Sequence, residues 1–140
     1  MTDIATETGW VVVDTDLVID FLRGKGAGSV LIPQLLAHGS FALSAVTAFE
    51  LRVGADFIAR GETIAPLLRR PPIAFDVASA LAGGQVAAEL TAAELTAAGL
   101  PIGMADCMQA GICLRYDLPL ATRNRKHFER ISGLRLLDLP

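Results

Sequence analysis

The sequence predicts an α/β fold of three layers, α/β/α, in which helices flank a small central parallel sheet. Short apolar runs alternate along the chain with longer segments that repeat apolar residues at helical spacing. Strands that alternate with helices in this way are typical of parallel sheets with right-handed crossovers. No internal repeat or linker divides the 140 residues. Since one core usually occupies roughly 100 to 200 residues, we expect a single domain over 1–140.

Five short apolar runs are expected to be strands. The first, Trp10–Val13, is continuously apolar and rich in valine, which is typical of a strand covered on both faces. The later runs are brief, and turn residues such as Pro71 and Pro72 separate them from the neighbouring helices. In chain order, the expected strands cover residues 10–13, 41–43, 73–75, 118–122 and 134–137.

Helical periodicity fills the segments between these strands. Asp16 and Asp76 precede two of the segments and are expected to be N-caps, because a short acidic side chain accepts hydrogen bonds from the first amides of a helix. Gly24 is expected to end the first helix, and a break at Gly83 and Gly84 is left open. In chain order, the expected helices cover residues 17–22, 27–37, 46–60, 62–70, 77–98, 104–116 and 126–131.

Polar side chains stand near the points where the predicted strands end. Asp14 follows the first strand directly, and Glu50 lies one helical turn after the second. Asp106 opens a later helix, and Asn124 follows the strand over 118–122. Ligands of open parallel sheets bind beyond the carboxyl ends of the strands. We therefore expect these four residues to converge on one crevice.

Three carboxylates packed together in such a crevice need a positive charge. Without one they repel each other and their pKa values rise. A divalent metal is the natural counter-ion, and ligands that are all oxygen favour Mg²⁺ or Mn²⁺ over zinc. A metal of this kind activates water and stabilises charge on a phosphate ester, so the acids predict phosphodiester hydrolysis.

The charge balance limits how the chain would hold a nucleic acid. A net charge of −3 argues against the broad basic surface that binds nucleic acid by phosphate neutralisation alone, so metal would do part of that work. Several cations nevertheless flank the expected crevice, and each would neutralise a phosphate or simply be solvated. They are Arg23, Lys25, Arg123, Arg125 and Lys126.

Three stretches that cover nearly the whole chain resemble a VapC-type PIN domain. The first, VVVDTDLVIDFLRG (Val11–Gly24), has a hydrophobic strand, an aspartate, a small hydroxyl residue and an apolar helix that ends in Arg-Gly. The second, LSAVTAFELRVGA (Leu43–Ala55), contains Glu50. The third, LPIGMADCMQAGICLRYDLPLATRNRKHFERISGLRLLDL (Leu100–Leu139), contains the third and fourth motifs, with Asp106 and Asn124.

The resemblance implies a metal-dependent endoribonuclease, a hydrolase of the toxin-antitoxin type. Such a protein binds Mg²⁺ or Mn²⁺, cleaves RNA, forms a homodimer and is inhibited by a VapB-like antitoxin. By this resemblance Asp14 and Asp106 are metal ligands, while Glu50 binds metal or orients the attacking water. Asn124 departs from the aspartate often found at its position, which leaves a second tightly held metal in doubt.

Each of these residues also has a structural interpretation. Thr47-Ala-Phe-Glu50 fits a capping box, in which the glutamate folds back onto the N-cap amide. Asp106 can also be explained as an acid in the first turn of a helix, where the helix dipole favours negative charge. Asn124 can be explained as an ordinary turn residue. Thr122, at a strand end, is expected to hydrogen-bond the acidic cluster. Asp16 is expected to be an N-cap, with a supporting role near the cluster left open.

Two other functions remain open from the sequence. The run Asp14-Thr-Asp16-Leu-Val18 also resembles the opening of haloacid-dehalogenase-type phosphatases, in which the first aspartate is the nucleophile. Those enzymes also need a later lysine and a late acidic pair, and no acidic pair follows Asp106 in a suitable loop. The second alternative is a non-catalytic PIN-like binding protein, an interpretation that Asn124 keeps open.

The sequence also bears on location and redox state. The first nine residues lack the basic start and apolar run of a secretory signal, and no apolar stretch reaches the ~18 residues of a membrane span. We therefore expect a cytoplasmic protein. Cys107 and Cys113 fall within one expected helix on different faces, so we expect two reduced thiols.

Overall fold

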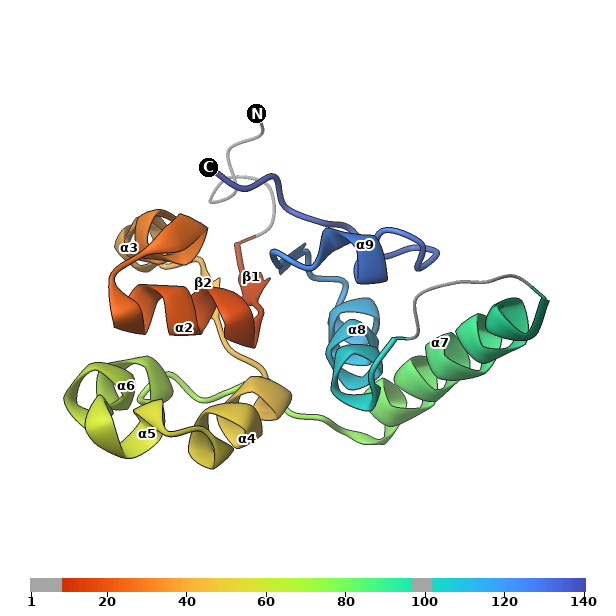
Figure 1. The fold of residues 1–140 in the computed structure, drawn as a ribbon, viewed down its shortest axis with the longest axis horizontal. Coiled ribbons are helices and arrows are strands. Elements are labelled where there is room, and N and C mark those ends of the chain that lie inside the picture. The colour runs from red at the N-terminus through yellow and green to blue at the C-terminus, as the bar shows by residue number, and fades with distance from the viewer. Residues whose placement is uncertain (1–8, 97–101) are drawn as a thin grey trace.

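A small sheet lies between two groups of helices in the computed structural model, which describes residues 9–96 and 102–140 (Figure 1). Its strands run in the order β2-β1-β3, and both neighbours are parallel to β1. The central strand pairs Val11 with Phe41 and Val12 with Leu120. The strands are β1 (Val11–Val13), β2 (Phe41–Ala42) and β3 (Leu120–Ala121). The predicted α/β fold with a small parallel sheet between helices is confirmed.

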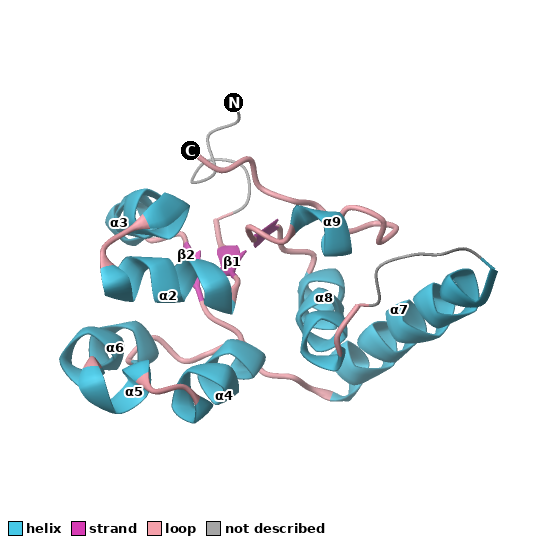
Figure 2. Ribbon diagram, in the orientation of Figure 1, coloured by secondary structure: helices cyan, strands magenta, loops and turns pink. Residues whose placement is uncertain are grey.

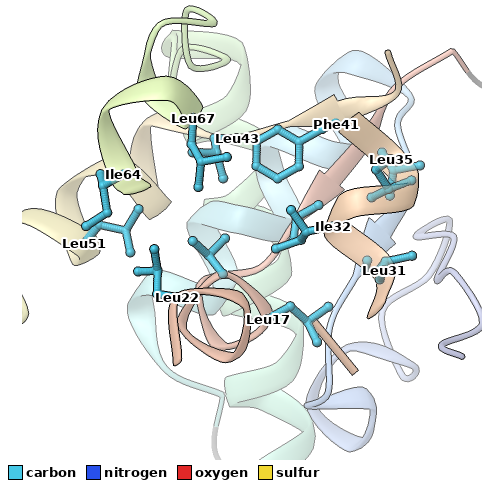
Figure 3. Close-up of a cluster of buried hydrophobic side chains, with 14 residues drawn as sticks. Leu17, Leu22, Leu31, Ile32, Leu35, Phe41, Leu43, Leu51, Ile64 and Leu67 are labelled. Atoms are coloured by element: carbon cyan, nitrogen blue, oxygen red, sulfur yellow. The ribbon is translucent and has the colours of Figure 1, made fainter. Parts of the chain in front are cut away.

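The alternation of side chains along β1 divides the core into two layers. Val11 and Val13 point to one face and belong to a cluster with helix residues such as Leu17 and Ile32 (Figure 3). Val12 points to the opposite face and packs in a second cluster with Leu120. Because both faces are covered, the run is apolar throughout.

The helices from the first half of the chain pack on the side of Val11 and Val13, and α2 packs closely on α3 (Figure 1). A Cβ atom on Gly28 would lie 2.0 Å from the carbonyl oxygen of Leu17, so this contact requires glycine. These helices are α2 (Thr15–Arg23), α3 (Gly26–His38), α4 (Ala45–Val53), α5 (Asp56–Ala59) and α6 (Gly61–Leu68).

Helices from the second half of the chain pack on the other side with Val12, and there the long α7 packs against α8 (Figure 2). A Cβ atom on Gly111 would lie 2.4 Å from the carbonyl oxygen of Ser79, so the two backbones approach as closely as glycine permits. These helices are α7 (Val77–Thr96), α8 (Met104–Tyr116) and α9 (Arg125–Phe128). Among the described residues, no helix combines the length and apolar character needed to cross a membrane.

Some predicted elements are shorter than expected. The expected strand over 73–75 is reduced to one parallel bridge between Ile73 and Ser44, because α4 begins immediately after Ser44 and leaves no further partner. The expected strand over 134–137 is likewise one bridge, between Leu136 and Leu120. Only residues 120–121 of the strand expected over 118–122 pair in the sheet.

Three further points concern where the helices begin and end. The helix expected over 46–60 is two helices, because Gly54 adopts extended backbone angles and ends α4. α7 runs through Gly83 and Gly84 without a break to residue 96, and its expected last two residues, 97–98, lie outside the described residues. Asp14, rather than Asp16, is the N-cap of α2.

Candidate active site

Asp14 stands where β1 ends and α2 begins. Its Oδ1 accepts a hydrogen bond from the amide of Thr15 at 2.9 Å, so the carboxylate caps the helix that it precedes. Its Oδ2 accepts a hydrogen bond from Thr122 Oγ1 at 2.7 Å. Thr122 directly follows β3, so the parallel pairing of β1 and β3 brings both residues to one edge of the sheet. The expected contact of Thr122 with the cluster is confirmed.

The environment of Asp14 disfavours its negative charge. The side chain is only 7% exposed, and this burial is the largest cause of a rise in its pKa from 3.8 to about 7. The charges of Asp16 and Asp106 raise the pKa further, while hydrogen bonds from Thr122 and Thr15 lower it. Burial and the charge of Asp14 also raise the pKa of the Cys113 thiol. A cation at this edge would relieve the imbalance.

Glu50 approaches this edge from α4. Ser44 is the N-cap of that helix, and its Oγ accepts the amide of Thr47 at 3.1 Å. The capping box at Thr47 is therefore wrong, because the helix begins earlier and Glu50 lies in its middle. Glu50 Oε1 instead accepts a hydrogen bond from Thr15 Oγ1 at 2.7 Å. This contact ties the glutamate to the residue that follows Asp14.

Asp106 and Asn124 are joined by a histidine. Asp106 lies in the first turn of α8, and its Oδ2 is 3.3 Å from Nδ1 of His127. The side-chain amide nitrogen of Asn124 is 2.8 Å from the same ring nitrogen. The backbone amide of Asn124 donates to Thr122 Oγ1 at 3.0 Å, which links this group to Asp14.

A second acidic pair borders Asp14 on α2. The backbone amide of Arg123 donates to Asp16 Oδ2 at 3.2 Å, and Arg123 Nε lies 3.4 Å from Asp20 Oδ2. Burial raises the pKa of Asp16 and Arg123 lowers it. The Oδ1 atom of Asp16 is buried without a hydrogen-bond partner among the described residues. Asp20 is buried as well, at 4% exposed.

The five predicted RNA-contacting cations differ in their surroundings. Arg23 forms an ion pair with Asp56 at 3.0 Å, and Arg123 is paired as described above. Arg125 donates to the carbonyl oxygen of Leu137 at 3.0 Å. Lys25 and Lys126 are exposed. Contact of these residues with RNA stays a prediction.

The sequence analysis did not identify four residues at this edge as parts of the site. Spacing could have indicated Gln109, which lies three residues after Asp106, because residues three apart share a helix face. Polar side chains in otherwise apolar helices, such as Gln109 and Thr47, are a second signal, because a buried polar group needs partners. The four residues are Thr15, Thr47, Gln109 and His127.

The donor chemistry of this edge fits a hard divalent cation. Carboxylate oxygens converge from β1, α2 and α8, and the buried Oδ1 of Asp16 lacks a partner. Within the described ranges, no three His, Cys, Asp or Glu side chains already form a ready metal site. Mg²⁺ commonly takes only one or two protein carboxylates and completes its shell with water and substrate oxygens. The assignment of Asp14, Asp106 and Glu50 as ligands stays a prediction.

Known proteins share both the sequence pattern and the architecture of this chain. The model of the PIN domain family matches residues 11–134. The tRNA(fMet)-specific endonuclease VapC of Shigella flexneri is 33% identical over 131 residues, which is 90% of this chain and 95% of that protein. A protein of the same name from Salmonella typhimurium is 31% identical over 106 residues, or 69% of this chain and 73% of that protein.

Solved structures agree with these sequence relatives. The DNA-bound VapBC structure from Salmonella typhimurium contains a chain that matches with a TM-score of 0.76 and 25% identity, covering 92% of this chain and 97% of that chain. VapBC2 from Rickettsia felis, bound to a promoter DNA fragment, matches with a TM-score of 0.74 and 20% identity, covering 91% of this chain and 96% of that chain. The second likeness concerns the fold.

Proposed function

The chain belongs to the PIN-domain family and to its VapC-type members, and from this premise we propose that it is a metal-dependent endoribonuclease toxin of a toxin-antitoxin pair. Residues 1–140 would act as a single PIN domain in the cytoplasm. The observation that carries the proposal is the buried Asp14 carboxylate, whose pKa is raised to about 7 beside Asp16 and Asp106. Such a group is suited to holding a cation rather than to standing unpaired.

Asp14 and Asp106 would hold Mg²⁺ or Mn²⁺, and waters and a phosphate oxygen would complete the shell. When bound, the ion supplies positive charge for the phosphate and acidifies a water for attack on phosphorus. Glu50 would bind the ion or orient that water, because Thr15 donates to its Oε1 and its other oxygen has no hydrogen bond from the part of the chain that the structure describes. Thr122 holds Asp14, and Asn124 would orient water or substrate through its amide.

The proposed substrate is RNA, and a transfer RNA is the class we favour. The 33% identical relative is named a tRNA(fMet)-specific endonuclease, which supports this choice. Lys25 and Lys126 are exposed cations that would contact the phosphate backbone, with Arg23, Arg123 and Arg125 as weaker candidates because they already hold protein partners.

The proposed partners are a VapB-like antitoxin and a second copy of the chain. VapBC complexes among the similar structures support the antitoxin. An apolar groove beside Glu50 also supports it, since Phe49 and Met104 on its rim are each 70% exposed. An antitoxin segment in this groove would lie against the active site and block it.

The test compares two glutamates of the same chain. Antitoxin-free protein is incubated with total RNA in Mg²⁺ or Mn²⁺, and cleavage is followed on sequencing gels. Glu50→Gln keeps an oxygen for Thr15 but removes the charge, so we expect at least a ~100-fold slower reaction with an unchanged melting temperature. Glu62→Gln alters an exposed glutamate on α6 and is the matched control, expected to cleave normally. Equal rates for both variants would remove Glu50 from the mechanism.

The two alternative functions make different predictions in the same assay. A phosphatase that uses Asp14 as nucleophile would form an aspartyl-phosphate that can be trapped, whereas the nuclease would not. A non-catalytic binding protein would neither bind Mn²⁺ nor cleave any RNA. Membership of the PIN family favours the nuclease over the phosphatase.

A further inference from the structure

Gln109 is a buried amide at the centre of the candidate active site. It lies on α8, is 1% exposed, and is surrounded on its helix by buried apolar residues such as Ala110 and Ile112. A buried amide is unfavourable unless its hydrogen-bonding groups are satisfied. The side chain is therefore expected to have defined partners.

The partners of Gln109 fix the orientation of its amide. Its Oε1 accepts a hydrogen bond from Ser44 Oγ. Its Nε2 faces Thr47 Oγ1 at 3.0 Å and Asp14 Oδ1 at 3.4 Å. The reverse orientation would place the amide oxygen against Asp14 Oδ1, which already accepts the amide of Thr15. The amide nitrogen must therefore face Asp14.

The same amide reaches Glu50 through two threonines. Thr15 Oγ1 lies 2.7 Å from Glu50 Oε1 and 3.0 Å from Thr47 Oγ1. Thr15 Oγ1 donates to Glu50 Oε1, and a hydroxyl has only one proton to give. The proton between the two threonines then comes from Thr47, whose oxygen accepts from Gln109. All donors in this series point towards Glu50.

We propose that Gln109 is a positioning residue that fixes Asp14 and Glu50 relative to each other. One amide holds the carboxylate from the end of β1 directly and the carboxylate from α4 through Thr47 and Thr15. The inference deepens the proposed nuclease function and rests on it. Gln109 itself touches neither metal nor substrate, and it acts through the two acids.

Gln109→Leu tests the links to both acids, because it removes the amide oxygen and nitrogen at similar size. Mn²⁺ affinity is measured by calorimetry on metal-free, antitoxin-free protein, and cleavage by single-turnover kinetics. We expect Mn²⁺ binding and cleavage each to weaken about 10- to 100-fold, as is typical when a partner that orients a ligand is lost. Ile112→Val shortens a fully buried apolar side chain of the same helix without removing a hydrogen-bonding group, and is expected to keep both values.

Thr47→Val tests the branch to Glu50 and does not depend on the fold of the first variant. It removes the hydroxyl at nearly constant shape, while Gln109 can still donate to Asp14. We expect slower cleavage with Mn²⁺ affinity changed less than by Gln109→Leu. In the double variant the losses in cleavage should not add, because Gln109→Leu has already removed the first link of that branch.

The possible results distinguish the positioning role of Gln109 from the nuclease function on which it rests. A wild-type protein that neither binds Mn²⁺ nor cleaves RNA would overturn the nuclease proposal itself. If the wild type does both, normal Mn²⁺ affinity and cleavage in folded Gln109→Leu would overturn the positioning role. Should Gln109→Leu not fold, normal cleavage by Thr47→Val would overturn it. Additive losses in the double variant would likewise contradict the series of hydrogen bonds.

Discussion

At the scale of single residues, Asp14 has two roles that oppose each other energetically. As the N-cap of α2 it satisfies the amide of Thr15, which stabilises the fold. As a buried acid beside Asp16 and Asp106 it disfavours its own ionisation. The fold therefore tolerates the charge at this position at a cost in stability, as is common for catalytic groups.

Replacing Asp14 by asparagine should abolish cleavage while retaining the fold. Asparagine is as good an N-cap as aspartate, and its oxygen can still accept from Thr15. The charge that would hold the metal is lost, so we expect RNA cleavage to fall at least ~1,000-fold. Gel assays measure the cleavage of RNA, and circular dichroism measures whether the fold is retained. Full metal-dependent cleavage by Asp14→Asn would contradict the assignment.

The raised pKa of Asp14 also predicts how stability depends on pH. Between the unfolded pKa of 3.8 and the folded pKa of about 7, the unfolded chain releases this proton while the folded chain keeps it. The contribution of Asp14 to the free energy of unfolding therefore falls by at most roughly 4 kcal/mol as the pH rises through this window. Above the window it is constant. Urea unfolding in EDTA at pH values from 4 to 8 measures this change in the free energy of unfolding.

Asp14→Asn is the control for this pH dependence, because it removes the titrating group. Its free energy of unfolding relative to wild type should rise from pH 4 to pH 7 and then remain level. A difference between the two proteins that does not change with pH would show that Asp14 titrates normally.

At the scale of elements, the layer opposite α2 depends on close contact between α7 and α8. A Cβ atom on Gly111 would lie only 2.4 to 2.8 Å from backbone atoms of Ser79 and Gly83 on α7, which is too close for any other residue. The contact sets the position of α8. Since α8 also bears Asp106 and Gln109, this helix pair supports the site as well as the core.

Two glycine substitutions should have opposite effects on stability. Gly111→Ala forces backbone apart and should lower the free energy of unfolding by roughly 2–3 kcal/mol. Gly84→Ala meets nothing within 4 Å on the exposed face of α7, so its better helix propensity should add about 0.5–1 kcal/mol. Urea unfolding of both variants measures the two effects. Equal changes would mean that the helices can separate freely.

At the scale of the whole molecule, the negative net charge and the acidic edge both favour binding of a cation. The chain has a net charge of −3, and Asp14, Asp16 and Asp106 lie close enough for their charges to interact. An RNA substrate would approach this edge against like charge. Metal ions would therefore assist both binding and chemistry.

Mn²⁺ should stabilise the folded protein against heat. A ligand that binds only the folded state at 100 times its Kd adds about 2.7 kcal/mol. For a chain of this size that corresponds to a rise in Tm of roughly 5–10 °C. Differential scanning fluorimetry with and without Mn²⁺ measures the shift, and Asp14→Asn should lose most of it. An equal shift in that variant would place the ion elsewhere.

The sequence alone determined the features that depend on neighbouring residues. The apolar run Trp10–Val13 predicted the central strand, and the periodicity over 104–116 predicted α8 at its observed bounds. The order of strands and helices predicted the parallel sheet, which placed Asp14 and Thr122 at one edge. These features are local or follow from chain order, so periodicity and strand ends suffice to find them.

Only the tertiary structure decided the features that need partners distant in the chain. Ser44 is the N-cap of α4, which excludes the capping box proposed for Glu50. A bridge to Ile73 and a contact with Gln109 fix where α4 begins. Asp20 is buried because α3 and Arg123 cover it. Gln109 resembles any polar helix residue until Asp14, Ser44 and Thr47 are seen to surround it. Burial and hydrogen bonding are properties of these assembled surroundings, which no single segment contains.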